Sequence, residues 1–157
     1  MIGKKVEKVL LSEIKKAKYF ALSVDSTPDL RHIDQLTFIV RHVKEDGIPI
    51  EWFLKFIEMH DHGAEGMTKL ILETTDELGL NIEDCRGQSY NNVTNMLGVY
   101  TGLQSRIKAV NRLAHFVPCT AHSLNLVGVA AAGSCLEAVS YFGFMQLLYN
   151  FLSASTY

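Results

Sequence analysis

The spacing of the apolar residues changes along the chain, and the order of these changes restricts the fold. Residues 1–18 have helical spacing. Three strand-like segments then follow, at residues 19–24, 36–40 and 50–56. Asp46-Gly47 is typical of a hairpin turn between the second and third of these segments. From Met67 onward, helical stripes alternate with short strands, so the predicted order after the first helix is β-β-β-α-β-α-β-α.

This order predicts an α/β fold built on one mixed sheet. Three strands joined by tight connections form an antiparallel meander, whereas a strand reached through a helix joins in parallel by a right-handed crossover. The two later strands are predicted at Ile82–Ser89 and Leu113–Val117, and Gly79 is placed to end the helix before them. We therefore expect a ribonuclease H-like sheet of five strands, three antiparallel and then two parallel, flanked by helices and incomplete.

The overall composition is that of a globular domain from a reducing compartment. Of the 157 residues, 48% are apolar and 20% are charged, which excludes a disordered chain. The net charge of −2 does not steer the chain toward nucleic acid or toward an acidic partner. Three cysteines, an odd number, argue against a disulfide framework and favour an intracellular protein without a visible targeting signal.

Charge is unevenly distributed between the two ends of the chain. Residues 1–18 carry six lysines against two glutamates and form a predicted basic amphipathic helix. The apolar face of this helix is Val6, Val9, Leu10, Ile14 and Ala17. We interpret its lysines as a solvated face rather than a phosphate-binding arm.

The C-terminal end has almost no charge. Glu137 is the only charged residue from Ser123 to Tyr157, and residues 138–152 are too short for a membrane span. We expect residues 1–18 to be the basic helix, 19–134 a partial ribonuclease H-like domain, and 135–157 an apolar helix that begins a missing helical insertion. An uncovered helix of this kind would cause self-association or bind a protein through residues 136–152, without a membrane.

Three ordered sequence blocks resemble one known family. They are Ser23-Val-Asp-Ser-Thr-Pro-Asp29 with Asp34-Gln-Leu-Thr-Phe38, Cys85-Arg-Gly-Gln-Ser-Tyr-Asn-Asn92 with Asn95-Met96, and Phe116-Val-Pro-Cys-Thr-Ala-His-Ser-Leu-Asn125. Together they resemble the catalytic domains of hAT-superfamily transposases, most closely the hAT-like proteins of the zinc finger MYM-type and TTF-type group. Three blocks in order are much more specific than any one motif.

The resemblance implies an ancestral site for cutting and joining DNA. Family members hold two divalent ions, Mg²⁺ or Mn²⁺, with three acidic residues. The first acid corresponds to Asp25 and the second to Asn91, while the third lies beyond Tyr157. Asn91 keeps an oxygen but lacks the charge that a hard cation favours. From the residues alone, Asp25 also fits a turn-capping aspartate, so it is a candidate metal ligand rather than an assigned one.

Cys119 and His122 match the Cys-x-x-His element of the same family. The resemblance implies a structural pair at the start of a helix, close to the catalytic edge. A zinc site would need two more ligands, and His60-x-His62 does not have the usual paired spacing. We therefore favour the structural interpretation, without zinc or another cofactor.

The resulting hypothesis is a transposon-derived fragment that is catalytically inactive and binds DNA or a protein, in the nucleus by family resemblance. One alternative is an active metal-dependent transposase or nuclease fragment, complemented by the missing segments, that uses Mg²⁺ or Mn²⁺. Another is a protein-interaction domain that pairs through its apolar C-terminal helix. Asn91 favours the inactive interpretation over the active one.

Overall fold

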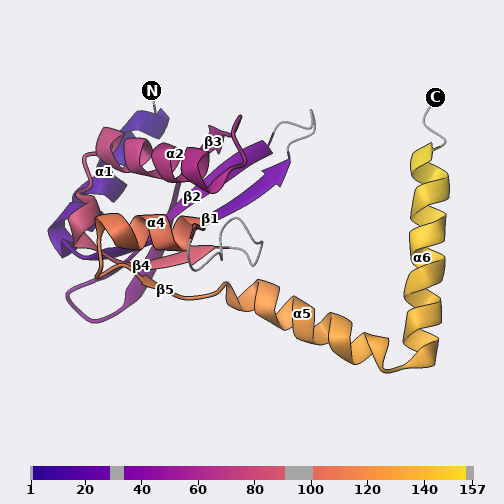
Figure 1. Ribbon diagram of the computed structural model, residues 1–157. Coiled ribbons are helices and arrows are strands. Elements are labelled where there is room, and N and C mark those ends of the chain that lie inside the picture. Colours follow the sequence, from indigo (N-terminus) through magenta and orange to yellow (C-terminus); the bar gives the residue numbers. More distant parts are fainter. Residues whose placement is uncertain (1, 29–33, 91–100, 155–157) are drawn as a thin grey trace. The chain divides into compact units, whose positions relative to one another are not determined.

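The computed structural model describes residues 2–28, 34–90 and 101–154. The chain divides into two compact units, Met1–Cys119 and Thr120–Tyr157. The first unit is α/β and the second consists of two helices (Figure 1). The first helix belongs to the first unit, and residues 120–134 group with the C-terminal helix. The predicted domain boundaries after residues 18 and 134 stay a prediction.

The first unit is built around one mixed sheet. Its elements are α1 (Ile2–Ala17), β1 (Phe20–Pro28), β2 (Asp34–Val43), β3 (Pro49–Glu58), α2 (Ala64–Glu77), the 3-10 helix η1 (Ile82–Asp84), β4 (Cys85–Tyr90), α4 (Leu103–Val110) and β5 (His115–Phe116). The strand order is β3-β2-β1-β4-β5 (Figure 1). The β1–β2 and β2–β3 pairs are antiparallel, and the β1–β4 and β4–β5 pairs are parallel. The predicted sheet is therefore confirmed.

One face of the sheet carries the hydrophobic core. The strands alternate with period two, so every second residue of β1 and β2 points to the same side. Apolar members of this core include Ile14, Phe20, Leu22, Val24, Leu36, Phe38, Val40, Met67, Ile71, Leu103 and Ile107. They come from α1, α2 and α4 as well as from the two central strands, and each buried side chain of this size stabilises the fold by about 1.5–3 kcal/mol.

A β-bulge in β3 changes which of its residues face the core. Phe38 pairs with Lys55, while the next residue of β2, Ile39, pairs with Phe53, so Leu54 is the extra residue. Beyond the bulge the alternation is reversed, and Phe56 joins Phe53 on the face opposite the core. Phe53 and Phe56 are 47% and 59% exposed, with ring centroids 4.7 Å apart. Phe53 and Phe56 therefore lie outside the core.

The predicted turn glycines are confirmed. Gly47 has φ +82° in the hairpin between β2 and β3, and Gly79 has φ +63° just after α2. Both lie in the left-handed region, which glycine adopts without the steric penalty of a side chain. The amide of Gly79 donates to the carbonyl of Asp76 at 2.8 Å, which helps to end the helix.

Several predicted boundaries differ from the structure. The fourth strand begins at Cys85 rather than Ile82, because residues 82–84 form η1. The side chain of Asn81 accepts a hydrogen bond from the Glu83 amide at 3.0 Å and caps this short helix. The fifth strand is also shorter than predicted, with two residues.

The apolar face of α1 is buried only toward its C-terminal end. Ile14 is fully buried and Leu11 is packed against the core, whereas Val6 and Val9 are 50% and 59% exposed. The predicted face is therefore wrong for Val6 and Val9. At 3.6 residues per turn, Val9 lies on the side of α1 away from Ile14 and Leu11, which face the core.

The second unit contains α5 (Thr120–Gly133) and α6 (Leu136–Ala154). Neither helix buries a residue. The exposed large apolar side chains of α6 are Leu136, Val139, Tyr141, Phe142, Phe144, Met145, Leu147, Leu148, Tyr149, Phe151 and Leu152. No single helix in the described chain is long and apolar enough to cross a membrane, although α5 and α6 together, bent by 112°, have the length and composition of a broken span.

Candidate functional site

The carboxyl ends of β1 and β4 lie side by side at the centre of the sheet. Their last parallel pair is Val24 with Tyr90, and Asp25 follows Val24 directly. Asn91 follows Tyr90 in the sequence and lies outside the described residues. The predicted proximity of Asp25 and Asn91 therefore stays a prediction, although each comes directly after one member of a strand pair.

Asp25 lies on the face of the sheet opposite the core. It pairs with Thr37 across the β1–β2 ladder, while its neighbour Val24 points into the core and is 2% exposed. Asp25 itself is half-buried. Among the described residues, no group of three or more His, Cys, Asp or Glu side chains is arranged to hold a metal ion.

Cys119 reaches the same edge of the sheet. The chain after β5 continues along β4, with the Val117 amide donating to the Gln88 carbonyl at 2.9 Å and the Cys119 amide donating to the Tyr90 carbonyl at 3.3 Å. Cys119 forms no disulfide bond and is half-buried. The structure thus brings Asp25, Tyr90 and Cys119 to the place where the parallel pairing of β1 with β4 stops, while β1 itself continues to Pro28.

The second member of the predicted Cys-x-x-His element lies in the other unit. His122 is in the first turn of α5, which begins at Thr120, directly after Cys119. Cys119 and His122 therefore lie on either side of the first residue of α5. The zinc-free structural role of this pair stays a prediction.

A buried network fixes the end of β4 from the core side. The Tyr90 hydroxyl donates to Gln88 Oε1 at 2.9 Å, and Gln88 Nε2 donates to the carbonyls of Ala114 and Gln104 at 2.8 and 3.2 Å. The Tyr90 ring also stacks on Phe116, with centroids 6.0 Å apart. The sequence does not point to this network, although polar Gln88 at an inward-facing strand position is a signal that could have found it.

A second buried network fixes the start of β4. Asn111 ends α4 and is 7% exposed. Its Nδ2 donates to the carbonyls of Ile82 and Cys85, both at 2.8 Å, and its Oδ1 accepts from the Leu113 amide at 2.9 Å. One amide side chain thus connects η1, β4 and the segment that leads into β5.

Burial of Tyr90 predicts a pH-dependent contribution to stability. Desolvation, and to a smaller extent the Coulombic effect of Cys85, raise the pKa of the Tyr90 phenol above its ordinary value. The folded state therefore favours the protonated phenol, and this stabilisation is complete below about pH 10 and is lost as the pH rises above it. We expect the free energy of unfolding of the unmodified chain to fall more steeply above pH 10 than that of Tyr90→Phe.

Urea unfolding followed by circular dichroism between pH 7 and pH 11 measures this difference. At pH 7, Tyr90→Phe should cost about 1–2 kcal/mol because Gln88 Oε1 loses its donor. Tyr141→Phe, at an exposed position, is the control for loss of a phenol. Parallel pH profiles for the unmodified chain and Tyr90→Phe would contradict the prediction.

Comparison with known protein families shows to which family this chain belongs. Residues 1–102 match the DUF4371 family, described as the ZMYM1/FAM200 RNase-like domain. The chain belongs to this family. The predicted relationship to hAT-like proteins of the zinc finger MYM-type group is thereby confirmed. The DUF4371 match includes the positions of Asp25 and Asn91 and ends before Cys119 and His122.

Two curated relatives extend the match beyond the DUF4371 region. The human "52 kDa repressor of the inhibitor of the protein kinase" is 28% identical over 147 residues, and the mouse protein of the same name is 27% identical over 147 residues. Each alignment covers 84% of this chain and 18% of the relative. The chain therefore spans less than a fifth of the length of these relatives.

Proposed function

We propose that this hAT-derived, RNase-like domain does not cut DNA and serves as a binding module. The observation that carries the proposal is the composition of the edge where β1 and β4 end. Asp25 is the one acid implied by the resemblance in the described part of the chain, and the second position is Asn91. A two-metal reaction needs charged oxygen ligands around both ions, and one carboxylate with one amide supplies one of the three negative charges that the resemblance implies.

The neighbours of Asp25 at this edge do not replace the missing acid. The Tyr90 side chain is on the core face and its hydroxyl donates to Gln88, so its oxygen is held away from the face that carries Asp25. Cys119 offers a thiol, and sulfur is a poor ligand for Mg²⁺ or Mn²⁺. This chemistry supports loss of catalysis over the alternative of an active nuclease or transposase fragment.

The relatives support a regulatory rather than a catalytic role. The human and mouse proteins are named as repressors, and we extend to this chain a part in a regulatory protein. A nuclear location is proposed from the resemblance to hAT-like proteins. Its role there would be binding, either to DNA or to another protein. Protein binding has a specific observation in its favour, because α6 exposes eleven large apolar side chains between Leu136 and Leu152.

We expect the purified chain to leave supercoiled plasmid intact in the presence of either Mg²⁺ or Mn²⁺, and to catalyse no strand transfer. Asn91→Asp should increase metal affinity, measured by calorimetry, without producing cleavage, because a third acid is still needed. Agarose gels of plasmid nicking over time provide the measurement.

Two aspartate variants separate a real activity from contamination. Asp25→Ala removes the candidate ligand, whereas Asp76→Ala removes an exposed carboxylate on α2. Metal-dependent nicking that disappears in Asp25→Ala and persists in Asp76→Ala would overturn the proposal and establish the active alternative. Nicking that persists equally in both variants would indicate a contaminating nuclease.

A further inference from the structure

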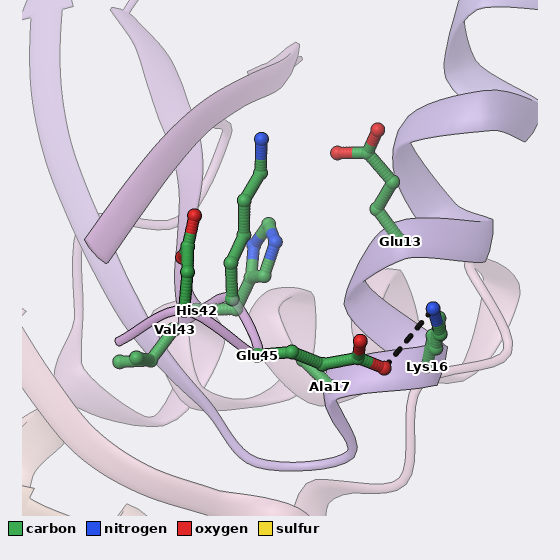
Figure 2. A pocket seen from close by; sticks show the side chains of 8 residues that line it. Glu13, Lys16, Ala17, His42, Val43 and Glu45 are labelled. Atoms are coloured by element: carbon green, nitrogen blue, oxygen red, sulfur yellow. Dashed lines mark ion pairs between the residues drawn. The ribbon is translucent and has the colours of Figure 1, made fainter. Parts of the chain in front are cut away.

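A cavity of about 550 Å³ lies between α1 and the hairpin that joins β2 to β3 (Figure 2). Its lining residues are Glu13, Lys16, Ala17, His42, Val43, Lys44, Glu45 and Asp46. His42 pairs with Phe20 at the start of β1, so the cavity is at the opposite end of the strands from Asp25. It is therefore separate from the site described above, and its volume is typical of small-ligand sites.

Two polar atoms at this cavity are buried and have no hydrogen-bond partner. They are Glu13 Oε2 and His42 Nδ1. His42 as a whole is 2% exposed. Figure 2 shows the Glu13 carboxylate and the His42 ring directed toward the space between them. A buried polar group without a partner costs about 1–3 kcal/mol, and more when it is charged, so the arrangement fits a bound group that supplies the missing contacts.

The other carboxylates of the lining are already engaged. Glu45 forms an ion pair with Lys16 at 3.0 Å, with both side chains largely exposed (Figure 2). Asp46 Oδ1 accepts a hydrogen bond from the Ile48 amide at 3.1 Å within the turn. Glu13 therefore offers the buried negative oxygen of this cavity. The described residues provide no three-ligand cluster for a metal ion, which favours an organic donor.

We propose that this cavity binds a guanidinium group. Its planar N–H donors are held at fixed spacing, so one group can donate to Glu13 Oε2 and, in the tautomer that carries its proton on Nε2, to His42 Nδ1. Ala17 and the methylene groups of Lys16 provide an apolar surface for the remainder of the ligand. The guanidinium belongs either to a free small molecule or to an arginine side chain of a partner.

The test follows the histidine ring signals of the isotope-labelled chain by NMR during titration with N-methylguanidinium chloride. We expect the His42 signal to shift and to reach saturation as N-methylguanidinium is added. The melting temperature should rise over the same range of N-methylguanidinium concentrations. Tetramethylammonium chloride has the charge but no N–H donors and should produce neither effect. A blocked Gly-Arg-Gly peptide is the second probe. If the peptide binds at least tenfold more tightly than N-methylguanidinium, the site is assigned to an arginine side chain of a partner. If the two probes bind equally, the site is assigned to a free small molecule.

Two glutamate variants locate the binding. Glu13→Gln removes the proposed charge and should weaken binding by at least tenfold, whereas Glu45→Gln removes the same charge from the exposed ion pair and should change it less than twofold. A His42 signal that does not move, an equal shift with tetramethylammonium, or undiminished affinity in Glu13→Gln would each overturn the proposal. The melting-temperature measurement on the unmodified chain needs no variant and decides the case if Glu13→Gln does not fold.

Discussion

Replacing Asn111 by aspartate is expected to lower the free energy of unfolding by about 3–6 kcal/mol. The substitution barely changes the size of the side chain, but it replaces the two N–H donors with a second carboxylate oxygen. The carbonyls of Ile82 and Cys85 would then face that oxygen without a donor, and a charge would be buried beside them. Small domains have a total stability of about 5–15 kcal/mol, so the loss would be a large part of it.

The same substitution at Asn81 is the matched control. Asn81 is exposed, and its side chain serves as an acceptor for the Glu83 amide, which a carboxylate does equally well. We therefore expect Asn81→Asp to change the free energy of unfolding by less than about 0.5 kcal/mol. Urea unfolding monitored by circular dichroism compares the two variants. A difference between them below about 1 kcal/mol would show that the Asn111 hydrogen bonds do not hold β4 in place.

Truncation after Ser134 is expected to convert a self-associating chain into a monomer with higher solubility. Residues 1–157 include α6, whose apolar side chains are exposed around its circumference, and a surface of this kind promotes association. Truncation removes these side chains and leaves every strand of the sheet in place. Sedimentation velocity over a range of protein concentrations measures the change. A concentration-independent monomer for residues 1–157 would contradict the expectation.

Paired substitutions test the same surface without shortening the chain. The double substitution Phe144→Glu and Phe151→Glu places two charges at positions that are 62% and 72% exposed, and it should reduce self-association of the chain. Gln146→Glu with Asn150→Glu adds the same charge at polar positions of the same helix and keeps every apolar side chain. If both double substitutions reduce self-association equally, the added charge rather than the loss of apolar surface is the cause of the reduction.

The sheet could be predicted from the sequence because its signals are local. The Asp46-Gly47 turn and the alternation in β2 fix an antiparallel pair, and a helix before β4 requires a parallel crossover. The position of Asp25, one residue after the last β1–β4 pair, follows from the same information. The predicted first strand, residues 19–24, was nevertheless too short, because β1 continues to Pro28 in its pairing with β2.

Features that depend on packing between distant segments could not be predicted in this way. The bulge at Leu54 shifts the pairing of β3 with β2 by one residue, and the alternating apolar residues Ile50, Trp52, Leu54 and Phe56 do not reveal this shift. Asn111 and Ile82 are 29 residues apart, and their contact depends on how α4 packs beside η1. The cavity between Glu13 and His42 likewise depends on where the C-terminal half of α1 meets the end of β2.

The bulge in β3 also affects how copies of this chain can meet. β3 and β5 are the edge strands, and a regular edge offers unpaired backbone groups to which a strand of another molecule can be added. β3 interrupts its edge with the extra residue Leu54 and with Pro49, and β5 has only two residues. Neither edge is a good template for strand addition. Aggregates of the folded chain should therefore be helical in character, without the cross-β signature that amyloid dyes detect.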